Sequence, residues 1–335
     1  MLFALAAAIA VLLVNFVCLR QAVDPSLQRF CWIFAAISLS GSLVVLWYAL
    51  AAVNASRHSQ ALFDRGLVIE ARAASEHSRQ ESYVTLGLAI TLLAVVGSVS
   101  IVTMNNGTVQ QTFLQPALMI ASLKDVSRAF LVNIAMAVVA QILIMIFGLV
   151  LAVARMLPGR AGAPIRFLAI AYIDLFRAVP AIIVIYIIGF GLPLANIPII
   201  SQFPPVVFAV VALTATYSAY VAETYRSGIE SIHPSQWSAA RSIGLSYAKT
   251  LRYVILPQAV RNVIPPLLSA FIGLQKDTAL VNIIGTMDAF NQAKYYAYNN
   301  FNLSAVTVVA ILFFIVTIPQ TRLVDSLLAR RSKRT

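Results

Sequence analysis

Residues 129–156 read AFLVNIAMAVVAQILIMIFGLVLAVARM, and the only charged side chain among these 28 residues is that of Arg155, near the end. A helix of about 20 mostly apolar residues is long enough to cross the hydrocarbon core of a bilayer. The stretch therefore predicts a membrane-spanning helix, and it sets the fold class of the whole chain.

Seven further stretches have a similar length and apolarity, and the fifth and seventh of the series are less uniform than the others. We therefore expect an all-α membrane protein with about eight transmembrane helices. The eight stretches are Leu2–Leu19, Phe30–Val53, Tyr83–Met104, Ala129–Met156, Ile165–Leu192, Pro205–Val221, Asn262–Ile284 and Leu303–Leu323.

The composition agrees with this fold class. Of the 335 residues, 60% are hydrophobic and 11% are charged, whereas about 25% are charged in a soluble domain. The composition argues against a soluble fold of two domains, and the high hydrophobicity excludes a disordered chain. A net charge of +12 would indicate nucleic-acid binding in a soluble protein, but the cytoplasmic bias of Lys and Arg also explains it in a membrane protein.

The Lys and Arg residues are concentrated in alternate loops. Four segments on one side of the membrane hold 17 of the 24, the other loops hold five, and two lie within spans. Because cytoplasmic loops carry the excess of Lys and Arg, we expect both termini in the cytoplasm and no nucleic-acid partner. The four segments are Asn54–Ser82, Arg155–Arg166, Thr224–Arg261 and Arg322–Thr335.

The first apolar stretch has two interpretations. A secretory signal peptide carries a basic start and a small-residue cleavage site, and neither is found around Leu2–Leu19, so we expect an uncleaved span. Cys18 and Cys31 flank the first outer loop. They either form a disulfide in an oxidising periplasm or remain two thiols within the membrane, and the second alternative is favoured.

The chain divides near Ser127. Residues 1–127 are expected to form an N-terminal extension with three spans, residues 128–325 a transmembrane domain with five, and residues 326–335 a basic cytoplasmic tail. Within the extension, Asn54–Ser82 mixes both charges and contains no Pro and one Gly. This pattern predicts a solvated helical connector that extends from the second or third span, with partner binding as the alternative.

The cytoplasmic segment between the sixth and seventh spans is the most informative part of the chain. It is too polar to cross the membrane, yet it carries apolar residues at helical spacing. One short helix is expected to begin near Ser235, as N-cap or first-turn residue, and to end at Gly244. A second begins near Tyr247 and is closed by Pro257. We call residues 234–257 the elbow, because two short helices at an angle can dock into a partner's groove.

Four pieces of sequence carry a resemblance to a known family. Together they cover about Ser127–Asp325 and lie in order along the chain. The first resembles the E-A-A-x3-G-x9-I-x-L-P loop of binding-protein-dependent ABC transporter permeases, and the other three are similar to the polar amino-acid uptake (histidine/glutamine-type) subfamily. The pieces are Ser238-Ala239-Ala240-x3-Gly244-x9-Val254-x-Leu256-Pro257, Asp174-Leu-Phe-Arg177-Ala-Val-Pro180, Leu256-Pro-Gln-Ala-Val-Arg261-Asn-Val-Ile-Pro265-Pro266 and Lys276-Asp277-Thr278-Ala-Leu280.

The resemblance implies a type I ABC importer permease core of five helices, to which the first three spans are additional. It implies uptake of polar amino acids across the bacterial inner membrane by alternating access. The implied partners are ABC ATPase subunits, a periplasmic or lipid-anchored solute-binding protein, and a second permease copy or a homologous permease within the membrane lipids. ATP and Mg would be bound by the ATPase, with no cofactor in this chain. The alternatives are uptake of another small polar or cationic solute, and an ion-coupled secondary transporter.

The implied ATPase-coupling residues are those of the elbow. Ala239 and Ala240 allow close approach, Gly244 permits the turn between the helices, and Pro257, after Leu256, fixes the return to the membrane. Two residues depart from the family pattern, because Ser238 replaces the usual Glu and Val254 the usual Ile. Without the carboxylate, seating on the ATPase would depend more on backbone and shape.

Two sets of polar residues lie in or near the spans. Lys276 and Asp277 lie deep in the seventh, where charges usually face a cavity or a partner. Adjacent helical residues do not face each other, so each needs another partner, or the helix is interrupted there. Together with Thr278 they either line the translocation path or brace the helices. Asp174 and Arg177 are three residues apart and are expected to form a structural ion pair rather than a substrate contact.

The sequence contains no G-x-x-x-x-G-K-[ST] nucleotide loop, no metal-binding cluster and no hydrolase motif, so we expect a transport subunit and not an enzyme. A secondary transporter usually has buried carboxylates and internal repeats, and here only Asp277 lies deep. Glu223 and Arg226, at the inner end of the sixth span, are expected to anchor the helix at the membrane surface. The last outer loop carries three tyrosines that are expected either at the bilayer surface or against a solute-binding protein, namely Tyr295, Tyr296 and Tyr298.

Overall fold

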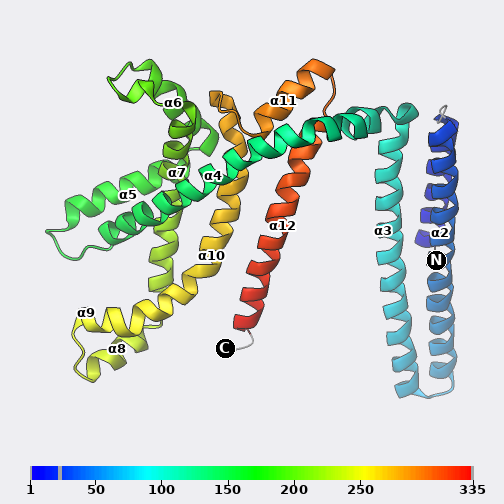
Figure 1. Ribbon diagram of the computed structural model, residues 1–335. Helices are drawn as coiled ribbons and strands as arrows, with labels where there is room; N and C mark the ends of the chain where they lie inside the picture. Colours follow the sequence, from blue (N-terminus) through cyan, green and yellow to red (C-terminus); the bar gives the residue numbers. More distant parts are fainter. Residues whose placement is uncertain (1, 22–24, 333–335) are drawn as a thin grey trace. The chain divides into compact units, whose positions relative to one another are not determined.

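The computed structural model describes residues 2–21 and 25–332, which form helices and turns with no strand among them (Figure 1). The expected all-α class is confirmed. The chain separates into two compact units, Met1–Gln115 and Pro116–Thr335. The position near Ser127, where the sequence pattern places the boundary, lies inside helix α4 (Pro116–Arg155).

The first unit consists of α1 (Leu2–Gln21), α2 (Pro25–Asp64) and α3 (Val68–Phe113). Helices α2 and α3 have 40 and 46 residues. In α3 the residues Asn105, Asn106 and Gly107 have positive φ, and the candidate span is Val68–Thr103. At about 1.5 Å per residue, α2 and this part of α3 are both much longer than the ~30 Å hydrocarbon core requires. The mixed-charge segment 54–82 is helical on both sides of a tight turn, in which Gly66 takes a φ of +78°. The predicted helical connector is therefore formed by the end of α2 and the beginning of α3.

Small side chains hold α1 against the α2–α3 hairpin. Ala4, Ala7, Ala49 and Ala89 are buried in one cluster, and such residues let helices approach closely in a membrane. Farther along, the Asn15 amide donates a buried hydrogen bond of 2.7 Å to Ser38. Cys31 is buried. The side chain of Cys18 lies outside the described part of the structure, and so does the predicted choice between a disulfide and two thiols.

The second unit holds α4 and the remaining elements. The basic tail begins within its last helix, and residues 333–335 lie outside the described part. The helices are α5 (Ala163–Ala178), α6 (Ala181–Leu194), α7 (Pro205–Glu230), α8 (Pro234–Ser242), α9 (Tyr247–Thr250), α10 (Leu256–Asp277), α11 (Ala289–Asn300) and α12 (Ser304–Ser332), with short 3-10 segments at Ile200–Gln202 and Thr278–Ile284 and a π-helical turn at Leu251–Ile255.

Helix α7 is central to this unit and packs against α4, α5, α6 and α10. Its Leu213 lies in a fully buried cluster with Ile144 and Leu274. Two glycines allow the helices to cross closely. A Cβ on Gly148 would lie 2.8 Å from Val221, and one on Gly228 would lie 2.0 Å from the Val263 side chain, so the α4–α7 and α7–α10 contacts both depend on the missing side chains.

The expected count of eight spans is not confirmed. Within the described residues, six helices are long and apolar enough to cross a membrane, or seven if one bent pair forms a single span. That pair is α5 and α6, which meet at 105°. The bend follows from Pro180, which has no N–H to continue the helix and disfavours a helical conformation at the residue before it. The first apolar stretch forms α1, whose described apolar part, Ala6–Val17, is shorter than a full crossing.

Candidate functional site

The first helix of the elbow, α8, begins with a side-chain cap. The ring nitrogen Nδ1 of His233 accepts a hydrogen bond of 3.2 Å from the backbone N–H of Ser235, so His233 is the N-cap and Ser235 lies in the first turn. Ala240 faces inward and is buried, while Ser238 and Ala239 are exposed. The chain then turns through Gly244, whose φ of +85° costs a residue with a Cβ about 1–2 kcal/mol.

The second half of the elbow differs from the expected form, because Pro257 does not close a helix. Helix α9 passes through the π-helical turn at Leu251–Ile255 directly into α10, and Pro257 lies in the first turn of α10. The N–H of Leu256 bonds to the carbonyl of Leu251, five residues earlier. Proline is tolerated at a helix start because the first N–H groups have no intrahelical partner. The π-helical turn therefore joins α9 to α10 as a continuous helix, with Pro257 in the first turn of α10.

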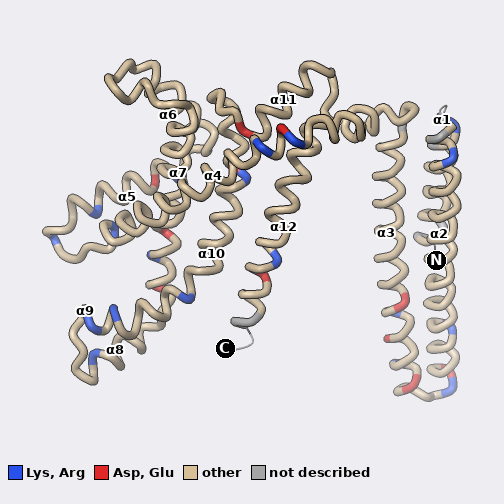
Figure 2. The backbone as a smooth tube through the Cα atoms, in the orientation of Figure 1, with Lys and Arg blue, Asp and Glu red and all other residues tan. Residues whose placement is uncertain are grey.

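A small core of its own holds the elbow on α7 and α10. Ile232, Ile255 and Ala259 are buried together, and the Trp237 ring stacks on Tyr247 with 5.3 Å between centroids. The outer side of the elbow carries exposed apolar and basic side chains, and Figure 2 marks the positions of Lys and Arg along the backbone around α8 and α9. These exposed residues are Arg241, Ile243, Tyr247, Lys249, Arg252 and Tyr253.

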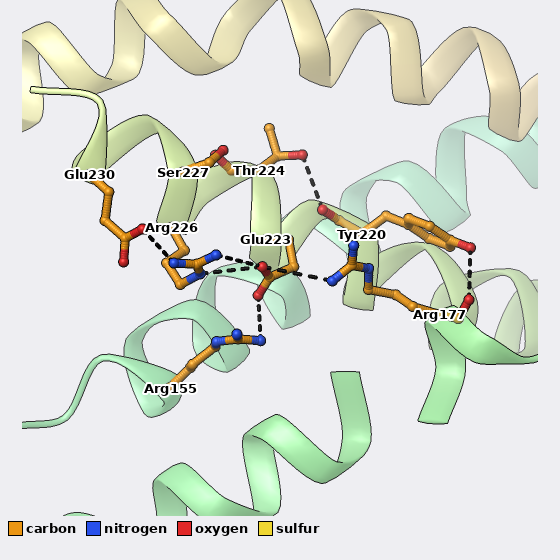
Figure 3. Close-up of polar contacts among 8 residues, drawn as sticks. All are labelled: Arg155, Arg177, Tyr220, Glu223, Thr224, Arg226, Ser227 and Glu230. Atoms are coloured by element: carbon orange, nitrogen blue, oxygen red, sulfur yellow. Dashed lines mark hydrogen bonds and ion pairs between the residues drawn. The ribbon is translucent and has the colours of Figure 1, made fainter. Parts of the chain in front are cut away.

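Four charged residues from three helices meet around one carboxylate (Figure 3). The carboxylate of Glu223 on α7 lies 2.6 Å from Arg155 at the end of α4, 3.0 Å from Arg226 and 3.8 Å from Arg177 on α5. Arg226 also pairs with Glu230. We call Glu223 and its three arginines the Glu223 clasp.

The clasp corrects the expected pairing of Asp174 with Arg177. Arg177 pairs with Glu223 instead, and its guanidinium lies 5.9 Å from the centre of the Tyr220 ring. Asp174 is exposed on α5, whereas the side chain of Glu223 is 16% exposed. A less solvated carboxylate attracts a cation more strongly than one screened by water, which explains why the tertiary partner is preferred to the neighbour on the same helix.

The polar residues of the seventh span lie where its helix changes form. Helix α10 ends at Asp277, and Thr278 starts a 3-10 segment. The hydroxyl of Tyr217 on α7 donates a hydrogen bond of 2.8 Å to Asp277. Lys276 is exposed. The helix of the seventh span is therefore interrupted after Asp277, which was one of the two alternatives. Asp277 also has a hydrogen-bond partner, Tyr217, on another helix.

A buried polar network surrounds Thr278. The amide of Asn133 on α4 donates to Thr278 and to Asp288, each over 3.1 Å, and its oxygen accepts from the N–H of Ala289 over 3.0 Å. Asp288 in turn caps α11 by accepting from the N–H of Asn291. Asn133, Thr278 and Asp288 are each at most 1% exposed, so this network joins α4, the 3-10 segment and α11.

Sequence reasoning missed Asn133, Tyr217 and Asp288, and it treated Glu223 only as an anchor. A signal was present for Asn133, because an amide in the apolar stretch 129–156 needs a partner away from lipid. Of the last outer tyrosines, Tyr296 donates a 2.6 Å hydrogen bond to Asp125, while Tyr295 and Tyr298 are exposed. Within residues 2–21 and 25–332 no three His, Cys, Asp or Glu side chains lie together as a metal site requires.

Comparison with known proteins identifies a family with which this chain shares its sequence pattern. Residues 144–334 match the family described as the binding-protein-dependent transport system inner membrane component. The chain belongs to this family. The matched residues lie wholly within the second unit and include the elbow and the clasp. The resemblance seen in the elbow motif is thereby confirmed, as are the ABC permease core and the role of a transport subunit in a multi-pass membrane protein.

Two relatives and one solved structure illustrate the similarity. The probable amino-acid permease protein YxeN of Bacillus subtilis (strain 168) is 33% identical over 208 residues, which cover 62% of this chain and 91% of YxeN. The probable glutamine ABC transporter permease protein GlnM of the same organism is 34% identical over 157 residues, 47% of this chain and 71% of GlnM. A crystal structure of an amino acid ABC transporter with histidines has a TM-score of 0.56 and 30% identity, over 64% of this chain and 94% of that one.

Proposed function

We propose that this chain is the permease subunit of an ATP-driven importer of polar amino acids in the bacterial inner membrane, with both termini in the cytoplasm. The observation that carries the proposal is the elbow, which is held as one body on α7 and α10 by the core around Ile255. Its exposed side presents Ser238, Ala239 and Gly244. The names of YxeN and GlnM support the substrate class.

The elbow would seat in a cleft of a separate ATPase subunit, which would bind the ATP and Mg²⁺. Small side chains at Ala239 and Gly244 allow that surface to approach closely, and Ser238 adds no charge where the family usually has Glu. The exposed Arg241, Lys249 and Arg252 are suited to acidic groups on the partner. Closure of two ATPases would then move the elbows and rock two permease subunits between inward- and outward-open states.

Lys276 and Asp277 are our candidates for the translocation path. An amino acid carries an ammonium and a carboxylate, and Asp277 and Lys276 offer the opposite charges. The Tyr217 hydroxyl already bonds to Asp277, so a substrate ammonium would share this carboxylate with it. Thr278 is assigned to the brace, because its hydroxyl is occupied by Asn133 and by the carbonyl of Gln275.

The test is reconstitution of the complete transporter, isolated through a tag on this chain, in liposomes containing ATP. Uptake would be measured with a panel of radiolabelled amino acids, starting with L-glutamine and including basic, acidic and apolar members. The proposal expects uptake of polar members that needs ATP, the ATPase and the solute-binding protein. Ala239→Arg should abolish uptake and ATPase recovery, because the large side chain blocks close approach. Ala161→Arg, on the exposed turn between α4 and α5, is the matched control.

Two results would change the proposed mechanism or the proposed substrate. Uptake that stops with an uncoupler alone and continues without the ATPase indicates an ion-coupled secondary transporter. ATP-dependent uptake of a different small polar or cationic solute, with no amino acid transported, keeps the importer mechanism and replaces its substrate.

A further inference from the structure

The Glu223 clasp brings charge from three helices to one carboxylate. Arg155 ends α4, Arg177 is one residue from the end of α5, and Glu223 and Arg226 belong to α7. Three guanidinium groups surround Glu223, whose carboxylate therefore holds together cations that repel one another. The side chains of Arg155 and Glu223 are only 21% and 16% exposed, so solvent screens this attraction less than it screens a surface pair.

The clasp lies on the direct connection between the elbow and the membrane core. Helix α7 continues from Glu223 through Arg226 to Glu230, where the chain turns into Ile232 of the elbow core. Across α7, Gly228 packs so closely on Val263 of α10 that no Cβ fits between them. A displacement of the elbow therefore moves the end of α7. The clasp is one of the polar contacts through which α4 and α5 would follow, beside the hydrogen bond of Tyr172 on α5 to the carbonyl of Ala215 on α7.

We propose that Glu223 is a positioning residue that couples the elbow to α4 and α5, so that three helices move as one body when the ATPase closes. The inference rests on the proposed function. Without the carboxylate, the guanidinium groups of Arg155, Arg177 and Arg226 repel one another, and the ends of α4 and α5 follow α7 less closely. ATP would then be hydrolysed with little transport.

Transport per ATP hydrolysed is the decisive readout, because a merely structural role would lower uptake and hydrolysis together. For the reconstituted complex, Glu223→Gln should keep ATP hydrolysis and lower the uptake of the amino acid that the wild type accumulates by about tenfold. Arg177→Gln removes the longest of the three contacts with the carboxylate, together with the contact to the Tyr220 ring. It leaves the carboxylate two partners and should fold normally, with a smaller decrease in the same ratio. The control is Arg322→Gln, which breaks an exposed pair with Asp325 and should leave the ratio unchanged.

A second measurement does not depend on transport. Spin labels on Met156→Cys and Ser227→Cys, both exposed, would report the distance between the ends of α4 and α7 in lipid nanodiscs, with Cys18 and Cys31 replaced by Ser. Glu223→Gln should lengthen or broaden this distance, and Arg322→Gln should not. Identical distance distributions, or an unchanged ratio of uptake to hydrolysis, would overturn the inference. A wild type without ATP-dependent uptake would instead refute the proposed function, and the label distances would still decide the clasp.

Discussion

Asp277 is a carboxylate near the end of an apolar helix, and its Tyr217 hydrogen bond distinguishes two roles. If Asp277 binds the substrate ammonium, Asp277→Asn should reduce uptake by about tenfold or more while the complex still assembles and hydrolyses ATP. The asparagine oxygen can still accept from Tyr217, so the change removes charge more than structure. Labelled uptake and subunit recovery measure the two effects.

The matched variant is Tyr217→Phe, which deletes the hydrogen bond and keeps the carboxylate. Uptake near the wild-type level in Tyr217→Phe, together with loss in Asp277→Asn, fits a role in the path. Equal loss of assembly in both variants would identify a structural brace between α7 and α10.

Asn133 forms three hydrogen bonds in the core, all of them to segments that are distant in the chain. Asn133→Ala leaves Asp288 and the N–H of Ala289 buried without this partner, which should cost about 1–3 kcal/mol of unfolding free energy. Denaturant titration of the detergent-solubilised chain measures the loss. Gln141→Ala, later on α4, serves for comparison, and equal unfolding midpoints for the two variants would contradict the network's importance.

Arg177 shows where single-residue reasoning from sequence fails. Its spacing from Asp174 satisfies the rule for neighbours on a helix face, and the rule identifies a possible pair correctly. Arg177 pairs with Glu223 and not with Asp174 because the carboxylate of Glu223 is less solvated. Glu223 also contacts two other arginines, Arg155 and Arg226. Nothing in the spacing along α5 contains that information.

At the scale of elements, the elbow offers a test of backbone conformation. Gly244 has a φ of +85° with open space around the position of a Cβ, so Gly244→Ala changes conformational preference without a clash. We expect the turn between α8 and α9 to shift and recovery of the ATPase with the tagged permease to fall several-fold, in line with a strain of about 1–2 kcal/mol.

Gly159 provides the control for this prediction. It also has a positive φ, +74°, and open space, but it lies in the turn between α4 and α5. Gly159→Ala should bear the same local strain and keep ATPase recovery unchanged. If both variants lose the ATPase equally, general destabilisation explains the effect, and the elbow has no special part in it.

The elements were predictable to different degrees. Long apolar stretches identified the helices that now form α2, α3, α4, α7, α10 and α12, because the bilayer requires a minimum length of contiguous apolar residues. The π-helical turn before Pro257 was not expected, and a kink or restart of the helix at Pro180 was expected without the size of its bend. Proline forbids one backbone hydrogen bond, but whether the chain then bends, widens or restarts is settled by what packs around it.

For the whole molecule, the family match falls entirely within the second unit. We therefore expect residues 116–335, expressed without the first unit, to insert into the membrane and retain ATP-dependent uptake to within a few-fold when reconstituted with the same partners. Immunoblots of membrane fractions and the uptake assay test this. Failure of the truncated chain to assemble, while the full chain does, would make the first unit part of the permease itself.

The sequence by itself determined the helical membrane class, the elbow with its turn at Gly244, and the family. These features depend on properties of contiguous residues, namely the length of an apolar run, the backbone freedom of glycine and the order of a motif. The tertiary structure alone decided the partners of the buried polar groups. Glu223, Asp277 and Asn133 bond to residues that are between 46 and 156 positions away in the chain, as well as to closer ones. A polar group in an apolar environment must find a partner, but its own segment does not specify which distant helix supplies it.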